Sequence, residues 1–352
     1  MFKSINSIQH VGAGVPDLES SWKWYRKMFG LDIALFKATA PAPLMDIYTH
    51  NKTLNKTAAM VMNLQGGCAM EIVQPVSEKC TAPESEILLG DFGIFITQMK
   101  TKNVRNTFNY YKKSGVNVLS EIVKTPNGEE TFYLKDPNGL LFQVVKGDAW
   151  FTNNGHFSGG TAGCVIGVSD IDKSKKLYCN LLGYDKVIYD ETKVFDDWAN
   201  IPGGRSKTRR VLLTQSASPG GGFAKVGGKT FIELVQTLDR TPKKIYENRI
   251  WGDLGFVHLG FDVKGMSEIK NEFSAKGFPF TCDSNNILHM GNTRVHCTYI
   301  EDPDGTLLEL IEVYRIPIIE KIGWFLNVKD RDPMKPLPSW ILKGLRFVRV
   351  RD

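Results

Sequence analysis

The sequence has 352 residues, of which 42% are hydrophobic and 23% are charged. This composition excludes an intrinsically disordered chain and is sufficient for two domains or one large body with a buried core. The 44 basic and 38 acidic residues give a formal charge of +6. Because the excess is mild, it indicates an ordinary solvated surface and no nucleic-acid partner, with an anionic substrate as the alternative.

The first predicted unit is a strand, a helix and three further strands. Apolar alternation predicts a strand from Ile8 to Val15, and Asp17 is a suitable N-cap for a helix over Leu18 to Phe29 that ends at Gly30. Strand-like segments follow at Ile33–Lys37, Ala58–Leu64 and Cys68–Gln74.

The parts of this unit return later in the chain. Six residues recur 153 positions downstream: Val15, Asp17, Ser21, Tyr25, Gly30 and Asp32 recur as Val168, Asp170, Ser174, Tyr178, Gly183 and Asp185. A second unit contains a helix over Val104–Ser114, an Asp136–Gly139 turn and a last strand over Leu140–Val145, and its counterparts are Ser267–Lys276, Asp302–Gly305 and Thr306–Val313. The chain is therefore predicted to contain four βαβββ modules of the α+β class in two pseudo-symmetric halves.

Composition shifts suggest the boundaries of these halves. We expect an N-terminal half over residues 1–148, a Gly/Asn-rich linker over 149–160, a C-terminal half over 161–314 and a tail over 315–352 that packs on the body. No stretch approaches the roughly 18 apolar residues that span a membrane, and the first residues lack the apolar run of a secretory signal. We therefore expect a cytoplasmic protein without a membrane partner.

Two His and two Glu residues occupy matching positions in the modules. His10 and His258 lie midway along first strands, and Glu71 and Glu309 lie within apolar last strands. A solvent-facing strand position or a hydrogen-bonded core histidine would explain any one of them, but a buried carboxylate is costly unless it is paired or binds a metal. The six cysteines form no Cys-x-x-Cys pair, which favours reduced thiols. The repeated pattern thus favours one divalent ion, Zn, Ni, Co, Mn or Fe, held by His and carboxylate ligands.

The element order, the His in the opening strand, the Val-x-Asp-(Leu/Ile)-x-x-Ser helix start and the Asp-Pro-(Asp/Asn)-Gly turn resemble the vicinal oxygen chelate superfamily over about residues 5–314. This superfamily includes glyoxalase I, methylmalonyl-CoA epimerase, extradiol dioxygenases and the fosfomycin and bleomycin resistance proteins. The resemblance, which is greatest to a fused four-module glyoxalase I-type protein, implies that paired modules form cup-shaped mixed sheets. It also implies that the metal ligands come from the first and last strands of the paired modules.

The resemblance leaves two module pairings open. If modules adjacent in sequence pair, as in extradiol dioxygenases, each cup holds three potential ligands. If module one pairs with four and two with three, as in fused glyoxalase I chains, one cup holds four: His10, Glu71, His258 and Glu309. The other cup would then keep Gln143 and Glu233, with Ile96 and Gly163 in the histidine positions. We favour the crossed pairing because it gives one complete and one decayed site.

A two-His, two-Glu site would bind the vicinal oxygens of a small-molecule substrate. We expect a metal-dependent lyase or isomerase that removes a proton next to a carbonyl, with the metal stabilising the enediolate. Glu309 or Glu71 would be the base, and substitution of Glu309 is expected to cause the larger loss. The alternatives are a non-catalytic binding or sequestering protein of the same fold, and a ring-cleaving non-haem iron dioxygenase. Gly163 argues against the dioxygenase, because its iron site needs His there.

Other polar residues give weaker indications. His296, Arg294 and Tyr299 lie on the strand before the Asp302–Gly305 turn and could bind substrate, although a surface strand explains them equally well. The run from Gly203 to Arg210 could bind phosphate or carboxylate, but a solvated loop is favoured. The sequence leaves the oligomeric state open.

Overall fold

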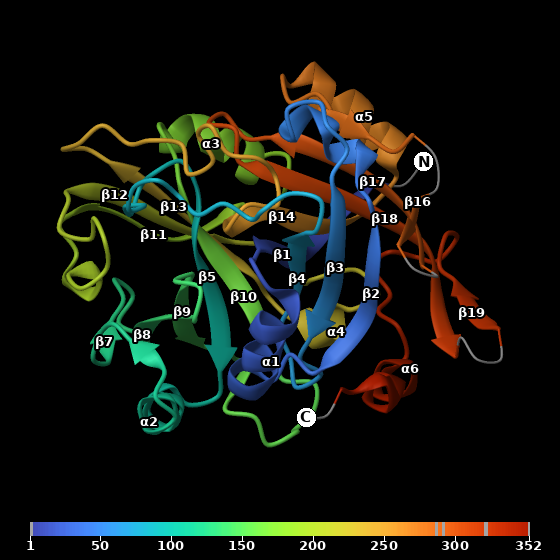
Figure 1. Cartoon of the computed structure of the whole chain (residues 1–352), viewed down its shortest axis with the longest axis horizontal. Helices are drawn as coiled ribbons and strands as arrows, with labels where there is room; N and C mark the ends of the chain where they lie inside the picture. Colours follow the sequence, from blue (N-terminus) through green and yellow to red (C-terminus); the bar gives the residue numbers. More distant parts are fainter. Residues whose placement is uncertain (1–2, 286–287, 291–292, 320–322, 351–352) are drawn as a thin grey trace.

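The computed structural model describes residues 3–285, 288–290, 293–319 and 323–350. Its described helices and strands follow the predicted order of four modules (Figure 1). Module one consists of β1 (Ser4–Gly14), α1 (Leu18–Phe29), β2 (Ile33–Pro41), a 3-10 helix η1 (Pro43–Tyr48), β3 (Asn55–Met62) and β4 (Ala69–Pro75). Module two consists of β5 (Gly93–Thr101), α2 (Val104–Lys113), β6 (Asn117–Val118), β7 (Val123–Lys124), β8 (Glu130–Lys135) and β9 (Leu141–Lys146).

The second half repeats this order. Module three consists of β10 (Ser158–Gly167), α3 (Ile171–Tyr178), β11 (Lys186–Lys193), a 3-10 helix η2 (Asp196–Trp198), β12 (Thr208–Thr214), α4 (Ala224–Gly227) and β13 (Phe231–Thr237). Module four consists of β14 (Gly255–Lys264), α5 (Met266–Ala275), β15 (Cys282–Asp283), β16 (Leu288–Met290), β17 (Thr293–Glu301) and β18 (Leu307–Ile319). The tail adds β19 (Trp324–Asn327), α6 (Ser339–Gly344) and a 3-10 helix η4 (Leu345–Val348). The predicted α+β class is confirmed.

The modules pair crosswise. β1 of module one runs antiparallel to β14 of module four, and β5 of module two runs antiparallel to β10 of module three. Modules one and four, here called the first cup, have the strand order β2-β3-β4-β1-β14-β18-β17. Modules two and three, the second cup, have the order β11-β12-β13-β10-β5-β9-β8. The crossed pairing favoured from the sequence is therefore confirmed.

A different contact holds neighbouring modules together within each half. Tyr25 of α1 donates to Asp136 Oδ2 at 2.7 Å, and Tyr178 of α3 donates to Asp302 Oδ2 at 3.0 Å. Each aspartate belongs to the Asp-Pro-x-Gly turn of the next module, so the repeated tyrosine and the repeated turn form one interaction. Burial raises the pKa of the Asp302 carboxyl to about 6, although backbone N–H groups and Tyr178 donate to it.

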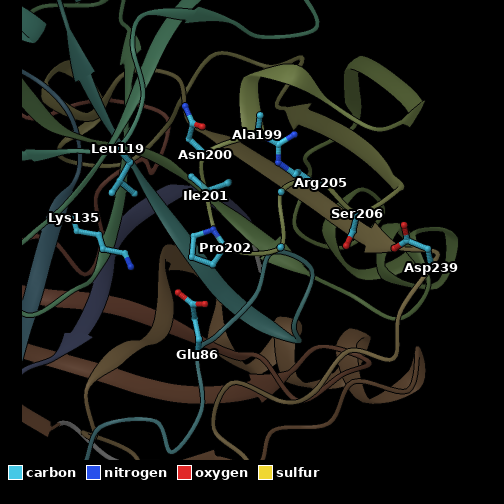
Figure 2. Close-up of a pocket in the computed structure, with 12 residues that line it drawn as sticks. Glu86, Leu119, Lys135, Ala199, Asn200, Ile201, Pro202, Arg205, Ser206 and Asp239 are labelled. Atoms are coloured by element: carbon cyan, nitrogen blue, oxygen red, sulfur yellow. The ribbon is translucent and has the colours of Figure 1, made fainter.

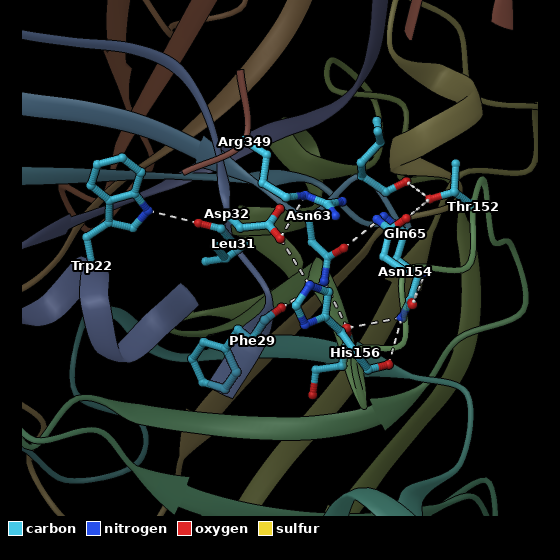
Figure 3. Close-up of polar contacts among 12 residues, drawn as sticks. Trp22, Phe29, Leu31, Asp32, Asn63, Gln65, Thr152, Asn154, His156 and Arg349 are labelled. Carbon is cyan, nitrogen blue, oxygen red and sulfur yellow. Dashed lines mark hydrogen bonds and ion pairs between the residues drawn. The ribbon is translucent and has the colours of Figure 1, made fainter. Parts of the chain in front are cut away.

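The region between the halves is tied to module one (Figure 3). β10 begins at Ser158, inside the stretch predicted as linker, and Ser158 is fully buried. His156 Nε2 lies 3.1 Å from Asp32 Oδ2, and Gln65 Nε2 donates to the His156 carbonyl at 2.9 Å. In the tail, Arg349 Nε also lies 3.1 Å from Asp32 Oδ2. One buried carboxylate thus joins module one, the inter-half segment and the tail.

Three further features bear on the sequence predictions. β18 continues to Ile319, beyond the predicted end of the C-terminal half at 314, and pairs with β19 of the tail. All six cysteines are free. Among the described helices, none has the length and apolar character needed to cross a membrane.

Candidate metal centre

Four neighbouring strands bring the predicted ligands together. His10 lies on β1 and His258 on β14, and these antiparallel strands form the centre of the first cup. Glu71 lies on β4, which is parallel to β1, and Glu309 lies on β18, which is parallel to β14. The first and last strands of both modules therefore each contribute one residue, as the resemblance implied.

The four side chains converge on one point. The two Nε2 atoms of His10 and His258 are 2.9 Å apart. Glu309 Oε2 lies 3.1 Å from His10 Nε2 and 3.5 Å from His258 Nε2, and Glu71 Oε2 lies 3.3 Å from His258 Nε2. One potential ligand atom from each residue lies within 4.8 Å of the others, and no residue of the four is more than 2% exposed.

The polar atoms of this cluster are poorly satisfied by the protein alone. Glu71 Oε1 and His258 Nδ1 are buried without a hydrogen-bond partner among the described residues. The facing Nε2 atoms of His10 and His258 can share only one proton between them, and two carboxylates lie beside them. A divalent cation would take up both imidazole lone pairs and neutralise both carboxylates. The donor set therefore fits one divalent metal ion, with these four residues as its ligands.

Glycine is required opposite each histidine. Gly12 pairs with His258 across the β1–β14 ladder, and Gly260 pairs with His10. A Cβ atom at Gly12 would lie 2.3 Å from His258 Cε1, and one at Gly260 would lie 2.2 Å from His10 Cε1. The imidazole rings therefore occupy space that any other residue would fill. The repeated His-x-Gly pattern is the sequence signal for this packing, and sequence reasoning did not use it.

The two glutamates have different surroundings. Glu309 Oε1 accepts hydrogen bonds from Tyr299 Oη and Cys297 Sγ, both at 2.8 Å, whereas Glu71 Oε1 has no hydrogen-bond donor among the described residues and lies 3.7 Å from Lys56 Nζ. Burial tends to raise the pKa of Glu71, but Lys56 and His258 outweigh it and hold that pKa below its usual range. For Glu309, burial is likewise outweighed, by His10 and His258, so its pKa is also lowered. Glu309 is thus fixed by β17, and Glu71 is less constrained.

An apolar layer covers the cluster. Trp251 stacks parallel to His258, with ring centroids 6.4 Å apart, and Lys56 Nζ lies 4.7 Å from the centroid of Trp251. The backbone N–H of Trp251 donates to the Tyr48 carbonyl of η1 at 2.9 Å. The same buried apolar group includes Ala42, Met45, Ala58, Val73, Val257, Val295 and Ile311. The cluster is therefore enclosed by hydrophobic side chains of both modules.

The three weaker substrate-binding candidates lie on β17 but do not all reach the cluster. Tyr299 is brought to the cluster, where it contacts Glu309. His296 is not, because strand alternation turns it to the face opposite Cys297, where its Nε2 lies 2.7 Å from Asp283 Oδ1. Arg294 Nε is buried without a hydrogen-bond partner among the described residues. A substrate-binding role for these residues stays a prediction.

The second cup contains an arginine among its acidic residues. Arg210 of β12 is fully buried, its Nε is bonded to Glu233 Oε1, and its Nη1 donates to Asp197 Oδ2 at 2.7 Å. Its guanidinium also lies 3.7 Å from the ring centroid of Trp198. Gln98 and Gln143 hydrogen-bond to each other nearby on β5 and β9. This cup is predicted to bind no metal.

Arg210 corrects the favoured interpretation of the Gly203–Arg210 run as a solvated loop. The rest of the run is largely at the surface: Lys207 is exposed, Arg209 is partly exposed, and Arg205 and Ser206 line a cavity of about 680 Å³ with Lys135, Glu86 and Asp239 (Figure 2). The mixed charges of that cavity do not define an anion site. Sequence reasoning missed Arg210 because a basic run is usually exposed, and only its alternation with apolar Val211 and Leu213 hinted at a strand.

Comparison with known proteins agrees with this arrangement. Two family models, both described as the Glyoxalase/Bleomycin resistance protein/Dioxygenase superfamily, match residues 7–144 and 164–295. The chain belongs to this superfamily. A mutant of glyoxalase I from Zea mays is 17% identical, with a TM-score of 0.55 over 88% of this chain and 94% of that chain. A putative dioxygenase from Bacillus subtilis is 14% identical, with a TM-score of 0.58 over 88% of this chain and 86% of that chain. At these identities, the similarity to the two solved structures shows the fold alone. The search of curated proteins found no match.

Proposed function

We propose that the protein is a metal-dependent lyase or isomerase that removes a proton next to a carbonyl. The observation that carries this proposal is the convergence of His10, Glu71, His258 and Glu309 in a buried site whose donor set fits one divalent ion. These two histidines and two glutamates lie in one cup, and the described residues form no second group of this kind. A small molecule is the proposed substrate, and a cytoplasmic location stays a prediction.

The metal ligands, the base and the apolar side chains have different proposed roles. When bound, the divalent ion would polarise the vicinal oxygens of the substrate and stabilise the negative charge that develops as the proton leaves. His10 and His258 hold their positions because their rings fill the spaces opposite Gly260 and Gly12. One glutamate accepts the proton from carbon, and the apolar layer around Trp251 keeps water away from the resulting carbanion.

The contacts favour Glu71 as the base, which revises the sequence expectation for Glu309. Glu309 is held by two donors on β17, Tyr299 and Cys297, so its geometry is fixed. Each glutamate has one buried oxygen without a hydrogen-bond partner among the described residues, Glu71 Oε1 and Glu309 Oε2, but only Glu309 has two such donors on its other oxygen. Glu71 therefore loses fewer hydrogen bonds when it turns toward a substrate. A general base must be able to reach the proton that it removes. We therefore propose Glu309 as the fixed ligand and Glu71 as the proton acceptor.

The first test is metal content. The purified protein should contain close to one divalent ion per chain by elemental analysis, and the chelator-treated protein should recover this ratio. His10→Ala and His258→Ala should lower the affinity for the ion, with a chelator competition as the readout. Two ions per chain, or none after incubation with any of the five candidate metals, would contradict the proposal.

The second test is proton exchange. A panel of 2-hydroxy ketones, 2-oxo acids and hemithioacetals is incubated in D₂O, and loss of the proton next to the carbonyl is followed by NMR. Exchange that requires the metal and Glu71 supports the enzyme. The enclosed apolar cover specifically favours one competing function, a non-catalytic binding protein. Metal-dependent binding of a panel member without any exchange would favour that alternative.

A further inference from the structure

We propose that the first cup selects a monoanionic substrate, a 2-oxo or 2-hydroxy carboxylate with an apolar body, whose carboxylate pairs with Lys56. This inference rests on the proposed function, because it names the substrate class of the same site. It is carried by the position of Lys56, by the charge of the cluster and by the apolar lining, each of which is independent of the reaction type.

Lys56 lies between the cluster and solvent. It extends from β3, and its side chain is 20% exposed, whereas the side chain of Glu71 beside it is 2% exposed. Its Nζ is 3.7 Å from Glu71 Oε1, which is too long for a hydrogen bond, and it rests against the face of Trp251. Lys56 therefore has Glu71 as an ion-pair neighbour, but no carboxylate is hydrogen-bonded to its Nζ among the described residues. Because its Nζ is so near a proposed ligand, a carboxylate bonded to it would lie directly beside the reacting oxygens.

Charge balance requires such a partner. Among the described residues, Lys56 is the one lysine or arginine that pairs with either glutamate. Two carboxylates balance a divalent ion, so the ammonium of Lys56 leaves the loaded site with one positive charge. Lys56 is only partly buried, but its ammonium lies against an apolar group of side chains, where a charge without a counter-ion is less well solvated than in bulk water. A monoanion would neutralise the site, a neutral ligand would leave the charge, and a dianion would reverse it.

The second cup gives an internal comparison. Its cation, Arg210, already contacts two carboxylates of the protein, Glu233 and Asp197. That guanidinium therefore needs no external anion. Lys56 differs because its one carboxylate neighbour among the described residues, Glu71, is 3.7 Å away and belongs to the proposed metal centre.

The lining identifies the rest of the substrate. The apolar group packed around the cluster includes Met45, Ala58, Val73, Trp251 and Ile311, all of them buried. A polar or highly charged body would have to leave its groups unpaired against these side chains. A short aliphatic or aromatic group fits this surface, whereas a peptide or nucleotide portion does not.

The test compares two probes of similar size that differ in charge. Phenylglyoxylate is a monoanionic 2-oxo acid, and 1-phenylpropane-1,2-dione is an uncharged vicinal dicarbonyl. Each is titrated by calorimetry into the full chain loaded with one equivalent of Zn²⁺. The wild-type protein should bind phenylglyoxylate at least about tenfold more tightly, as expected for one charge-assisted contact. Binding of phenylglyoxylate should disappear when the metal is removed.

Variants assign this preference to Lys56. Lys56→Met keeps the stem against Trp251 and should remove the preference by weakening phenylglyoxylate alone, whereas Lys56→Arg should retain it. Lys52→Gln is the matched control, because it deletes one positive charge from an exposed residue near the start of the same strand. Equal weakening of both probes in Lys56→Met, or no preference in the wild type, would overturn the inference alone. Failure of the chain to take up metal would overturn the proposed function with it.

Discussion

The packing of glycine against histidine gives a prediction that tests the candidate metal centre directly. In Gly12→Ala, the new Cβ atom would lie 2.3 Å from Cε1 and 2.5 Å from Nε2 of His258. Ordinary contacts at such positions begin near 3.4 Å, so the ring must move by about 1 Å. Metal sites require ligand distances within about 0.2 Å of their preferred values. Gly260→Ala should displace His10 in the same way.

Two effects should therefore appear together. Overpacking of this kind costs about 1–3 kcal/mol, which urea unfolding of the metal-free protein would measure. Displacement of one ligand should lower the metal affinity by about 10- to 100-fold or more, which competition with a chromophoric chelator would measure. Gly14→Ala is the matched control: Gly14 lies on the same strand as Gly12, but its Cβ would meet the Asp253 carbonyl oxygen at 2.0 Å and neither histidine.

The control separates packing from ligation. Gly14→Ala should lose stability but keep its metal affinity, and Gly344→Ala, whose Cβ meets nothing within 4 Å, should change neither. If Gly12→Ala and Gly260→Ala bind metal as tightly as the wild type despite lost stability, the two histidines are not ligands. The reasoning from strand register to metal centre would then be refuted.

Three further predictions concern buried charges. Glu71→Gln should keep the metal but lower turnover by about 100-fold, whereas Glu309→Gln should mainly weaken the metal; elemental analysis and steady-state kinetics check both. Arg210→Met should destabilise the protein by about 3–5 kcal/mol in urea, because Glu233 loses its cation, without changing the metal stoichiometry. Because burial raises the pKa of Asp302 to about 6, its contribution to stability is present below the unfolded pKa and is lost as the pH rises. Raising the pH from 5 to 7.5 should therefore lower the free energy of unfolding by about 1 kcal/mol more in the wild type than in Asp302→Asn, as urea unfolding would measure.

The fold was predictable because its determinants are local and repeated. The Asp17 side chain caps α1 and Gly30 adopts a left-handed conformation at its end, so the sequence predicted Leu18–Phe29 with the observed bounds. The crossed pairing followed from a count of potential ligands rather than from strand patterns. Strand register itself could not be predicted from the sequence. The pairing of Gly12 with His258 depends on this register, so it could not be predicted either.

The parts of the site that the sequence did not reveal depend on contacts between distant residues. Cys297 and Tyr299 were separated from Glu309 by a turn, and only the β17–β18 register shows that both reach the same carboxylate oxygen. Lys56 was one of 44 basic residues and carried no motif. Its importance follows from its distance to Glu71 and from the lack of a nearer partner.

The two cups satisfy one electrostatic requirement in different ways. Each buries at least one glutamate on a last strand, and a carboxylate in that position needs a cation. In the first cup, two imidazoles beside the carboxylates favour a divalent ion, so occupancy depends on metal supply. In the second, Gly163 leaves no imidazole on β10, and Arg210 supplies a permanently attached positive charge instead. Because a guanidinium is always present, we propose that the second cup folds without metal and that the first cup is where a cation can exchange and a substrate can bind.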